Sequence, residues 1–89
     1  MPFFTENSRK ECWKLRGQAK QLADRVYSIL NRDPSQQDLW NRLRRVADDL
    51  ILLSMSDAAD AVRLRKMDAL RKELEKLESE AAVAVFLNP

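Results

Sequence analysis

Several residue types are scarce in this chain of 89 residues, which has one cysteine, one glycine, three prolines and no histidine. The lone Cys12 cannot form a disulfide within the chain, and the usual zinc sites lack their histidine and cysteine ligands. We therefore expect no metal, no cofactor and a reducing, cytoplasmic setting. With 45% hydrophobic and 34% charged residues, the composition is typical of amphipathic helices rather than of disorder.

Long hydrophobic runs are also missing. The first residues, 1–7, lack the apolar core of a secretory signal. The apolar tail at 81–87 is far shorter than the roughly 20 residues that cross a bilayer. We expect a protein that stays in solution and has no membrane partner.

Net charge is small, at +2, but it is unevenly distributed. Residues 1–46 contain ten Lys/Arg and five Asp/Glu, whereas residues 47–89 contain six and nine. The overall charge does not by itself indicate a nucleic-acid partner. The basic first half nevertheless keeps that alternative open.

Helix signals divide the chain into three segments. Ser8 and Glu11 have the spacing of a capping box, and Asn31–Pro34 is typical of a helix end, so the first helix is predicted over 8–31. Ser35 is the predicted N-cap of a second helix over 36–54.

The third boundary depends on a cluster of short polar residues at 54–57, where Ser56 or Asp57 would cap a helix over 57–86. No glycine or proline lies between residues 35 and 88, so nothing forces a break. The alternative is a helical hairpin whose long second helix dimerises.

Apolar residues recur at alternating steps of three and four in each segment, which keeps one narrow seam against a neighbouring helix. The pattern predicts a single all-α domain over 1–89, an antiparallel three-helix bundle with coiled-coil-like packing. Phe3–Phe4 would cover the end near Met55, and Phe86–Leu87 the end near Pro34. The seam residues are Cys12, Leu15, Ala19, Leu22, Val26 and Ile29; Leu39, Leu43, Val46, Leu50 and Leu53; and Met67, Leu70, Leu74, Leu77, Ala81 and Ala84.

Catalytic patterns are not evident, and we expect neither an enzyme nor a small-molecule substrate. Cys12 lies on the seam, where a thiol behaves as a small hydrophobe. Several carboxylates have a cation four residues away, the spacing of helical ion pairs. These predicted pairs are Glu6 with Lys10, Asp38 with Arg42, Arg44 with Asp48, Asp68 with Lys72, and Lys76 with Glu80.

A mixed aromatic and basic stripe is predicted on the first helix, well away from its seam. Winding the helix at 100° per residue brings together Arg9, Trp13, Arg16, Lys20 and Tyr27. Such a stripe suits a protein contact or base stacking with phosphate contacts. It is equally compatible with a tryptophan covered by its own protein.

Leu50–Leu53 is apolar on every side, and Leu52 points away from the seam, so a partner or another segment is expected to cover it. Arg63 and Lys66 stand where the third seam would need apolar residues. From them we expect the start of the third helix to swing away from the bundle or to pack against a second chain.

Arg42, Arg44 and Arg45 form the densest basic group, and Arg42 and Arg45 are the possible nucleic-acid contacts. We consider a solvated charged face the simpler interpretation. The leading hypothesis is a regulator, adaptor or inhibitor that binds another protein, as a homodimer, through Arg9, Trp13, Arg16, Lys20, Tyr27 and Leu52. The alternative is a small nucleic-acid-binding accessory protein that uses the basic first half.

Overall fold

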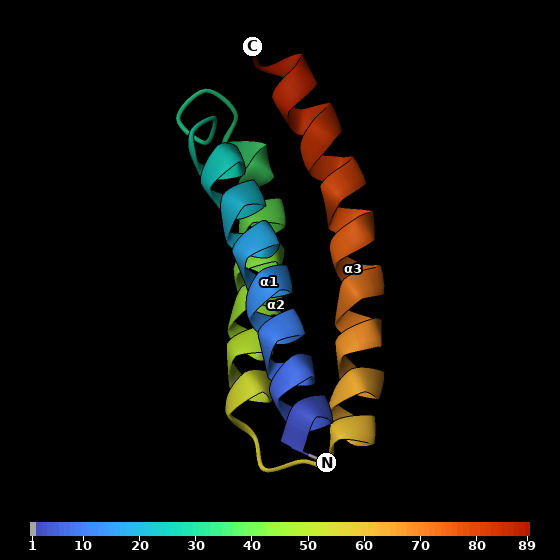
Figure 1. The fold of residues 1–89 in the computed structure, drawn as a ribbon. Coiled ribbons are helices and arrows are strands. Elements are labelled where there is room, and N and C mark those ends of the chain that lie inside the picture. The colour runs from blue at the N-terminus through green and yellow to red at the C-terminus, as the bar shows by residue number, and fades with distance from the viewer. Residues whose placement is uncertain (1) are drawn as a thin grey trace.

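Three helices make up the computed structural model, which describes the backbone of residues 2–89 and the side chains of residues 8–89. Helices α1 (Pro2–Tyr27), α2 (Gln37–Met55) and α3 (Asp60–Leu87) run up, down and up, and a short 3-10 helix, η1 (Pro34–Gln36), precedes α2 (Figure 1). Residues 2–89 contain no β-strand. The predicted all-α three-helix bundle is confirmed. The continuous second helix is wrong, because residues 56–59 separate α2 from α3.

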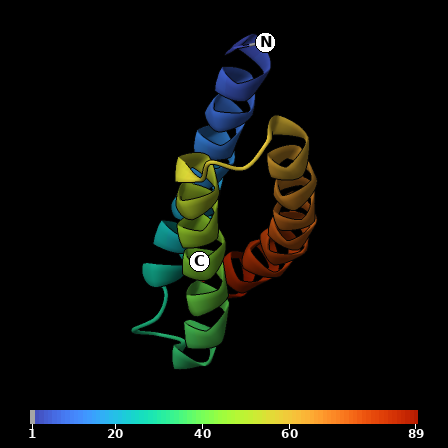
Figure 2. The same ribbon diagram turned by 90° about the horizontal axis from the view of Figure 1, so that it is seen from below.

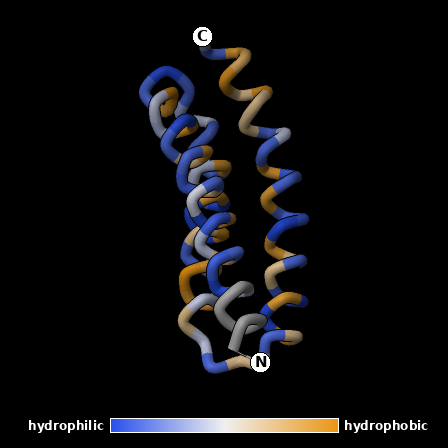
Figure 3. The backbone as a smooth tube through the Cα atoms, viewed as in Figure 1, coloured by the Kyte–Doolittle hydropathy of each residue, from blue (hydrophilic) through white to orange (hydrophobic). Residues whose placement is uncertain are grey.

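The core follows the predicted seam closely. Fifteen of its seventeen residues are buried, and the other two, Leu22 and Leu70, are half-buried against them. Ala23 and Ala47 are buried as well. Figure 3 shows hydrophobic residues recurring along each helix. They become almost continuous near the end of α2 and at the end of α3.

The bundle is elongated, about 49 × 17 × 15 Å. Helices α1 and α2 make the most extensive contact, and α3 packs less extensively against each of them. Figure 2, viewed from below, shows α3 beside the α1–α2 pair. One side of that pair is therefore left without a covering helix.

The predicted capping box at Ser8 is wrong, because α1 begins at Pro2 and Ser8 lies inside the helix. Ser8 is buried, and its hydroxyl oxygen accepts a hydrogen bond from Arg63 Nη1 at 3.1 Å. Ser8 therefore makes a tertiary contact with α3 and does not cap a helix. The side chains of Phe3 and Phe4, and the predicted pair of Glu6 with Lys10, lie outside the side chains that the structure describes.

The α1–α2 connection starts earlier than predicted, since α1 ends at Tyr27 rather than near Asn31. Asp33 lies outside the helical region, with φ −139° and ψ 79°, as expected for a residue before proline. Ser35 does not cap α2. Its hydroxyl donates to the Asp33 carboxylate, and the N-cap position is Gln36, without a side-chain cap bond.

At the end of α2, serine hydroxyls bond the last carbonyls of the helix, and no glycine is used. Ser56 Oγ donates to the Leu53 carbonyl at 2.9 Å, and Ser56 is extended. Ser56 is therefore the C-cap of α2, and the prediction that Ser56 or Asp57 is the N-cap of α3 is wrong. That position is Ala59, which has no side-chain cap bond.

Arg63 is the largest fully buried side chain, with 0% exposure. Its guanidinium donates to carbonyl oxygens at the end of α2 and in the connection: Nε to Leu53 at 3.3 Å, and Nη2 to Ser56 at 2.7 Å and to Ala58 at 3.1 Å. Carbonyls at the end of a helix lack intrahelical donors and carry partial negative charge, so a buried cation is well placed there. With Ser8, Arg63 joins all three helices.

The start of α3 therefore packs inside the bundle, and the prediction that it swings away is wrong. Its packing against a second chain stays a prediction. Asp60 Oδ1 lies 4.0 Å from Arg63 Nη1 and adds a nearby negative charge. Lys66 is exposed, as its charge requires. One turn after Arg63, the seam begins at Met67, whose Sδ accepts a weak hydrogen bond from Cys12 Sγ at 3.6 Å.

Polar contacts join the end of α3 to the α1–α2 connection. Asn88 Nδ2 donates to Asp33 Oδ2 at 3.2 Å, and Arg32 Nη1 donates to the Pro89 carbonyl at 2.8 Å. The predicted apolar cover near Pro34 is wrong, because Phe86 is 82% exposed and Leu87 is also exposed. The last turns of α3 thus keep their largest apolar side chains in solvent.

Replacing Arg63 tests the central contact. Arg63→Ala should lower the free energy of unfolding by about 3 kcal/mol, because it leaves buried carbonyls without their donor. Arg65→Ala, on an exposed residue of the same helix, should change it by less than about 0.5 kcal/mol. Urea denaturation followed by circular dichroism measures both, and equal stability of the two variants would contradict this role of Arg63.

A pH dependence follows from Asp33, whose pKa is lowered by hydrogen bonds from Ser35, Gln36 and Asn88. A lowered pKa in the folded state means that these bonds stabilise the protein above pH 4 and are lost as pH falls through the folded-state pKa. Asp33→Asn should therefore lower the melting temperature at pH 7, and the difference from wild type should shrink towards pH 3. Asp57→Asn, an exposed linker control, should show no such convergence.

Candidate protein-interaction surface

The predicted stripe on α1 is present and reaches solvent. Trp13 is 51% exposed and Tyr27 is 64% exposed, and Arg9 and Lys20 are exposed too. Arg16 is half-buried. The Trp13 ring is therefore only partly covered by its own protein. Leaving half of so hydrophobic a side chain in water costs free energy that a binding partner could recover.

Helix α2 extends this surface. The rings of Tyr27 and Trp40 lie 5.9 Å apart between centroids, tilted by 44°, a geometry within the favourable range for aromatic pairs. Because α1 and α2 are antiparallel, the end of the first helix meets the start of the second. Trp40 was missed in the sequence reading, although this register alone would have placed it beside Tyr27.

Each tryptophan has an arginine over it. The Arg16 guanidinium carbon lies 5.6 Å from the centroid of Trp13, and that of Arg44 lies 5.4 Å from the centroid of Trp40. Each such contact is worth about 0.5–1 kcal/mol at an exposed site. We name the surface formed by these residues the aromatic–arginine face. It consists of Trp13, Arg16, Lys20 and Tyr27 from α1 and Trp40 and Arg44 from α2.

The two arginines of this face have no carboxylate partner among residues 8–89. The predicted pair of Arg44 with Asp48 is not formed there, because the Arg44 guanidinium lies over Trp40. Arg16 Nε is buried without a hydrogen-bond acceptor. Lys20 has only an exposed pair, with Asp24 at 3.4 Å, which contributes little in water.

Arg42 has a different role. It lies on the α3 side of α2 and forms a two-bond pair with Glu80, with both N to O distances 3.0 Å. Hydrogen bonding to Glu80 is the main cause that raises the pKa of Arg42. Glu80 therefore pairs with Arg42 rather than with Lys76. The expected contacts of Arg42 with Asp38, at 3.8 Å, and of Lys72 with Asp68, at 3.4 Å, are present.

Arg45 and Leu52 are exposed on α2. The predicted convergence of Arg42 with the cations of α1 does not occur, because Arg42 turns towards α3 and bonds Glu80. Leu52 is 66% exposed and Met55 is also exposed, which leaves a small apolar area at the end of α2. Its neighbours Leu50 and Leu53 are buried as seam residues.

Chemistry at Cys12 is disfavoured by its surroundings. Burial raises the pKa of this thiol, although the nearby charge of Arg63 opposes the effect. A raised pKa leaves less of the reactive thiolate at neutral pH. Among the described residues, no group of three potential metal ligands is found, and no helix has the length and apolar character needed to span a bilayer.

Comparisons with protein-family models, curated proteins and solved structures gave no match to this chain. Its function is therefore inferred from its own surface, and the aromatic–arginine face is the feature with the most specific composition.

Fluorescence quenching tests the geometry of the face, because Trp13 and Trp40 are the only tryptophans. In Trp40→Phe, the remaining Trp13 should emit at longer wavelength and be strongly quenched by acrylamide, since half of its surface is in solvent. In Trp13→Phe, the remaining Trp40 is partly buried and should be quenched less. Equal quenching constants would contradict the exposure of Trp13.

Proposed function

We propose that this chain is a helical interaction module of the regulator, adaptor or inhibitor type, which binds another protein through its aromatic–arginine face. The observation that carries the proposal is the pair of cation–aromatic contacts, Arg16 on Trp13 and Arg44 on Trp40, in each of which one side chain is exposed, Trp13 and Arg44. Neither arginine has a carboxylate partner within residues 8–89. A partner protein can supply both the apolar cover and the missing acceptors.

Composition and preorganisation support a protein partner. Tryptophan, tyrosine and arginine are the residues most enriched among those that dominate binding energy at protein interfaces. Here their side chains are already held by stacking and by two packed helices, so little side-chain entropy remains to be lost on binding. The face is thus suited to binding without rearrangement.

The extent of the face also suits a protein. Trp13 and Tyr27 are separated by fourteen residues of α1, which is roughly 21 Å along a helix. That length corresponds to about four turns of a partner helix. Arg9 prolongs the face at one end, and Leu52 remains a predicted contact near its margin.

Nucleic acid is the weaker candidate. The net charge is only +2, Asp24 pairs with Lys20 beside the stripe, and Arg42 of the dense basic group is held by Glu80. Phosphate binding depends on several unpaired cations acting together. Among the described residues, Arg16 and Arg44 are unpaired but lie over tryptophan rings, which leaves Arg45 as an unpaired cation of the dense basic group.

Affinity capture with paired variants tests the proposal. Wild-type protein immobilised on beads should retain a protein from a lysate of the native host after nuclease treatment, and Trp13→Ala/Arg16→Ala should not. Loss of one central tryptophan or arginine contact costs about 2 kcal/mol, or roughly a 30-fold weaker dissociation constant. Titration of the purified captured protein would measure this difference.

Val83→Ala/Lys72→Ala is the matched control, because it removes an exposed apolar side chain and a cation from α3. It should capture the partner as wild type does. Identical capture by the face variant would refute the proposal. Retention that disappears on nuclease treatment would instead favour the nucleic-acid alternative.

A further inference from the structure

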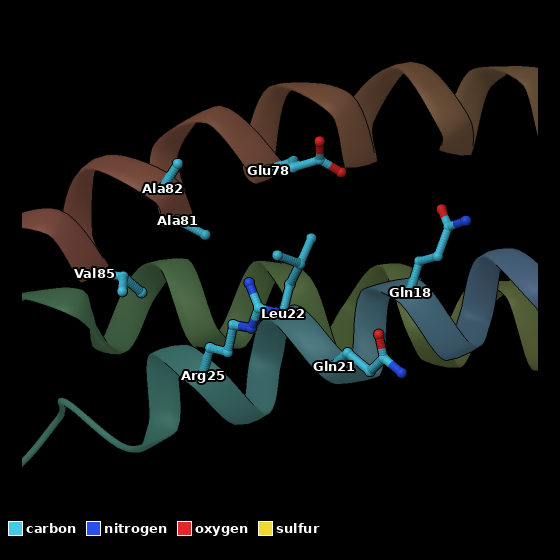
Figure 4. Close-up of a pocket in the computed structure, with 8 residues that line it drawn as sticks. All are labelled: Gln18, Gln21, Leu22, Arg25, Glu78, Ala81, Ala82 and Val85. Carbon is cyan, nitrogen blue, oxygen red and sulfur yellow. The ribbon is translucent and has the colours of Figure 1, made fainter.

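A groove lies between α1 and α3, on the other side of α1 from the aromatic–arginine face. Its main cavity has a volume of about 410 Å³, and Leu22, Ala81 and Val85 form its apolar lining (Figure 4). A second cavity continues it along the same two helices and shares Gln18 and Glu78 with it. Together the two cavities extend along α1 from Glu11 to Arg25 and along α3 from Arg71 to Val85.

The two walls of the main cavity differ in charge. Arg25 projects from the α1 wall and Glu78 from the α3 wall (Figure 4). Within the described part of the protomer they form no ion pair with each other. A helix seated in the groove is therefore favoured if it places a carboxylate near Arg25 and a cation near Glu78.

The end of α3 supplies a helix surface that fits. Ala82 and Val85 line the cavity, and Phe86, 82% exposed, lies only about 40° from Ala82 around the helix. The groove, and the apolar side chains Val85 and Phe86 that could fill the groove of another copy, thus lie on the same side of the protomer. A patch with both parts side by side is self-complementary under a two-fold axis.

We propose that the occupant is a second copy of this chain, whose α3 lies antiparallel in the groove and crosses the first α3 at Ala82. Alanine at the crossing allows the two backbones to approach closely. The crossing places the partner's Phe86 about one turn before Leu22, near the level of residue 18 of α1. It also places the partner's Glu78 level with Arg25, about four residues or 6 Å from the crossing.

This register follows from the direction of the helices. Helices α1 and α3 run the same way, and Leu22 and Ala81 line the same cavity. An antiparallel α3 therefore moves its residue 78 towards the level of α1 residue 25 and its residue 86 towards residue 18. The same contacts repeat on the other side of the axis, so the dimer contains two Arg25 to Glu78 pairs.

Sedimentation equilibrium of the full chain at about 50 μM tests the dimer. Wild type should sediment as a dimer, and Phe86→Asp should weaken the association at least 10-fold. The matched control is Leu52→Asp, an equally drastic change at another exposed apolar position, which should leave the association unchanged. Both variants should keep the wild-type circular dichroism spectrum, because both side chains are exposed.

Charge reversal tests the register. Arg25→Glu and Glu78→Arg should each weaken the dimer, since each places like charges together twice. The double variant Arg25→Glu/Glu78→Arg should recover it, because opposite charges then meet again across the interface. Recovery is specific to this pairing and does not depend on the aromatic–arginine face.

Three results would overturn the inference. They are a monomeric wild type at this concentration, dissociation by Leu52→Asp but not by Phe86→Asp, and a double variant no more dimeric than the single reversals. None of them bears on capture of a partner through Trp13 and Arg16, so the two proposals fail separately.

Discussion

The burial of one guanidinium at the end of α2 is the constraint on which the bundle depends. A chain with a single glycine must reverse direction between Met55 and Asp60 using residues that strongly prefer negative φ, and every non-glycine residue of the described chain has negative φ. Such a turn leaves carbonyls without donors. Arg63 reaches back from the first turn of α3 to the carbonyls of Ser56 and Ala58, and adds a donor to the Leu53 carbonyl, which Ser56 already bonds. The ordered connection and the position of α3 are therefore determined together.

The position of α3 then decides which surfaces remain open. Through Ser8, Arg63 also contacts α1, and at the other end Asn88 bonds to Asp33, so α3 is held along one side of the α1–α2 pair at both ends. The opposite side keeps Trp13 and Tyr27 in solvent. The less extensive contact of α3 with α1 leaves the groove beside Leu22. Both candidate surfaces are therefore consequences of where α3 is fixed.

The sequence predicted the repeated seam well because burial of leucine at steps of three and four is a local pattern that directly reflects packing. The sequence did not predict the role of Arg63, because a charged residue in the apolar seam pattern appears only as an interruption. The hydrogen-bond acceptors of Arg63 are backbone carbonyls 5 to 10 residues away, which no side-chain pattern reveals. Ser8 was misread for the same reason, because its role comes from a residue 55 positions later. In the aromatic–arginine face, the positions of Trp13 and Arg16 could be predicted from the periodicity of α1 alone. Those of Trp40 and Arg44 could be predicted only from how α1 and α2 pair.

The two surfaces lie on opposite sides of α1, which has a mechanistic consequence for the proposed dimer. Packing through Leu22, Ala82 and Phe86 covers the α1–α3 side and leaves Trp13 and Tyr27 of each copy in solvent. A dimer of this kind presents two identical aromatic–arginine faces, related by the two-fold axis. A partner that is itself dimeric, or that repeats its binding segment, would engage both faces at once, and its second contact would be effectively intramolecular. Binding of such a partner and self-association would then strengthen each other, whereas a partner with one binding segment would be indifferent to the oligomeric state.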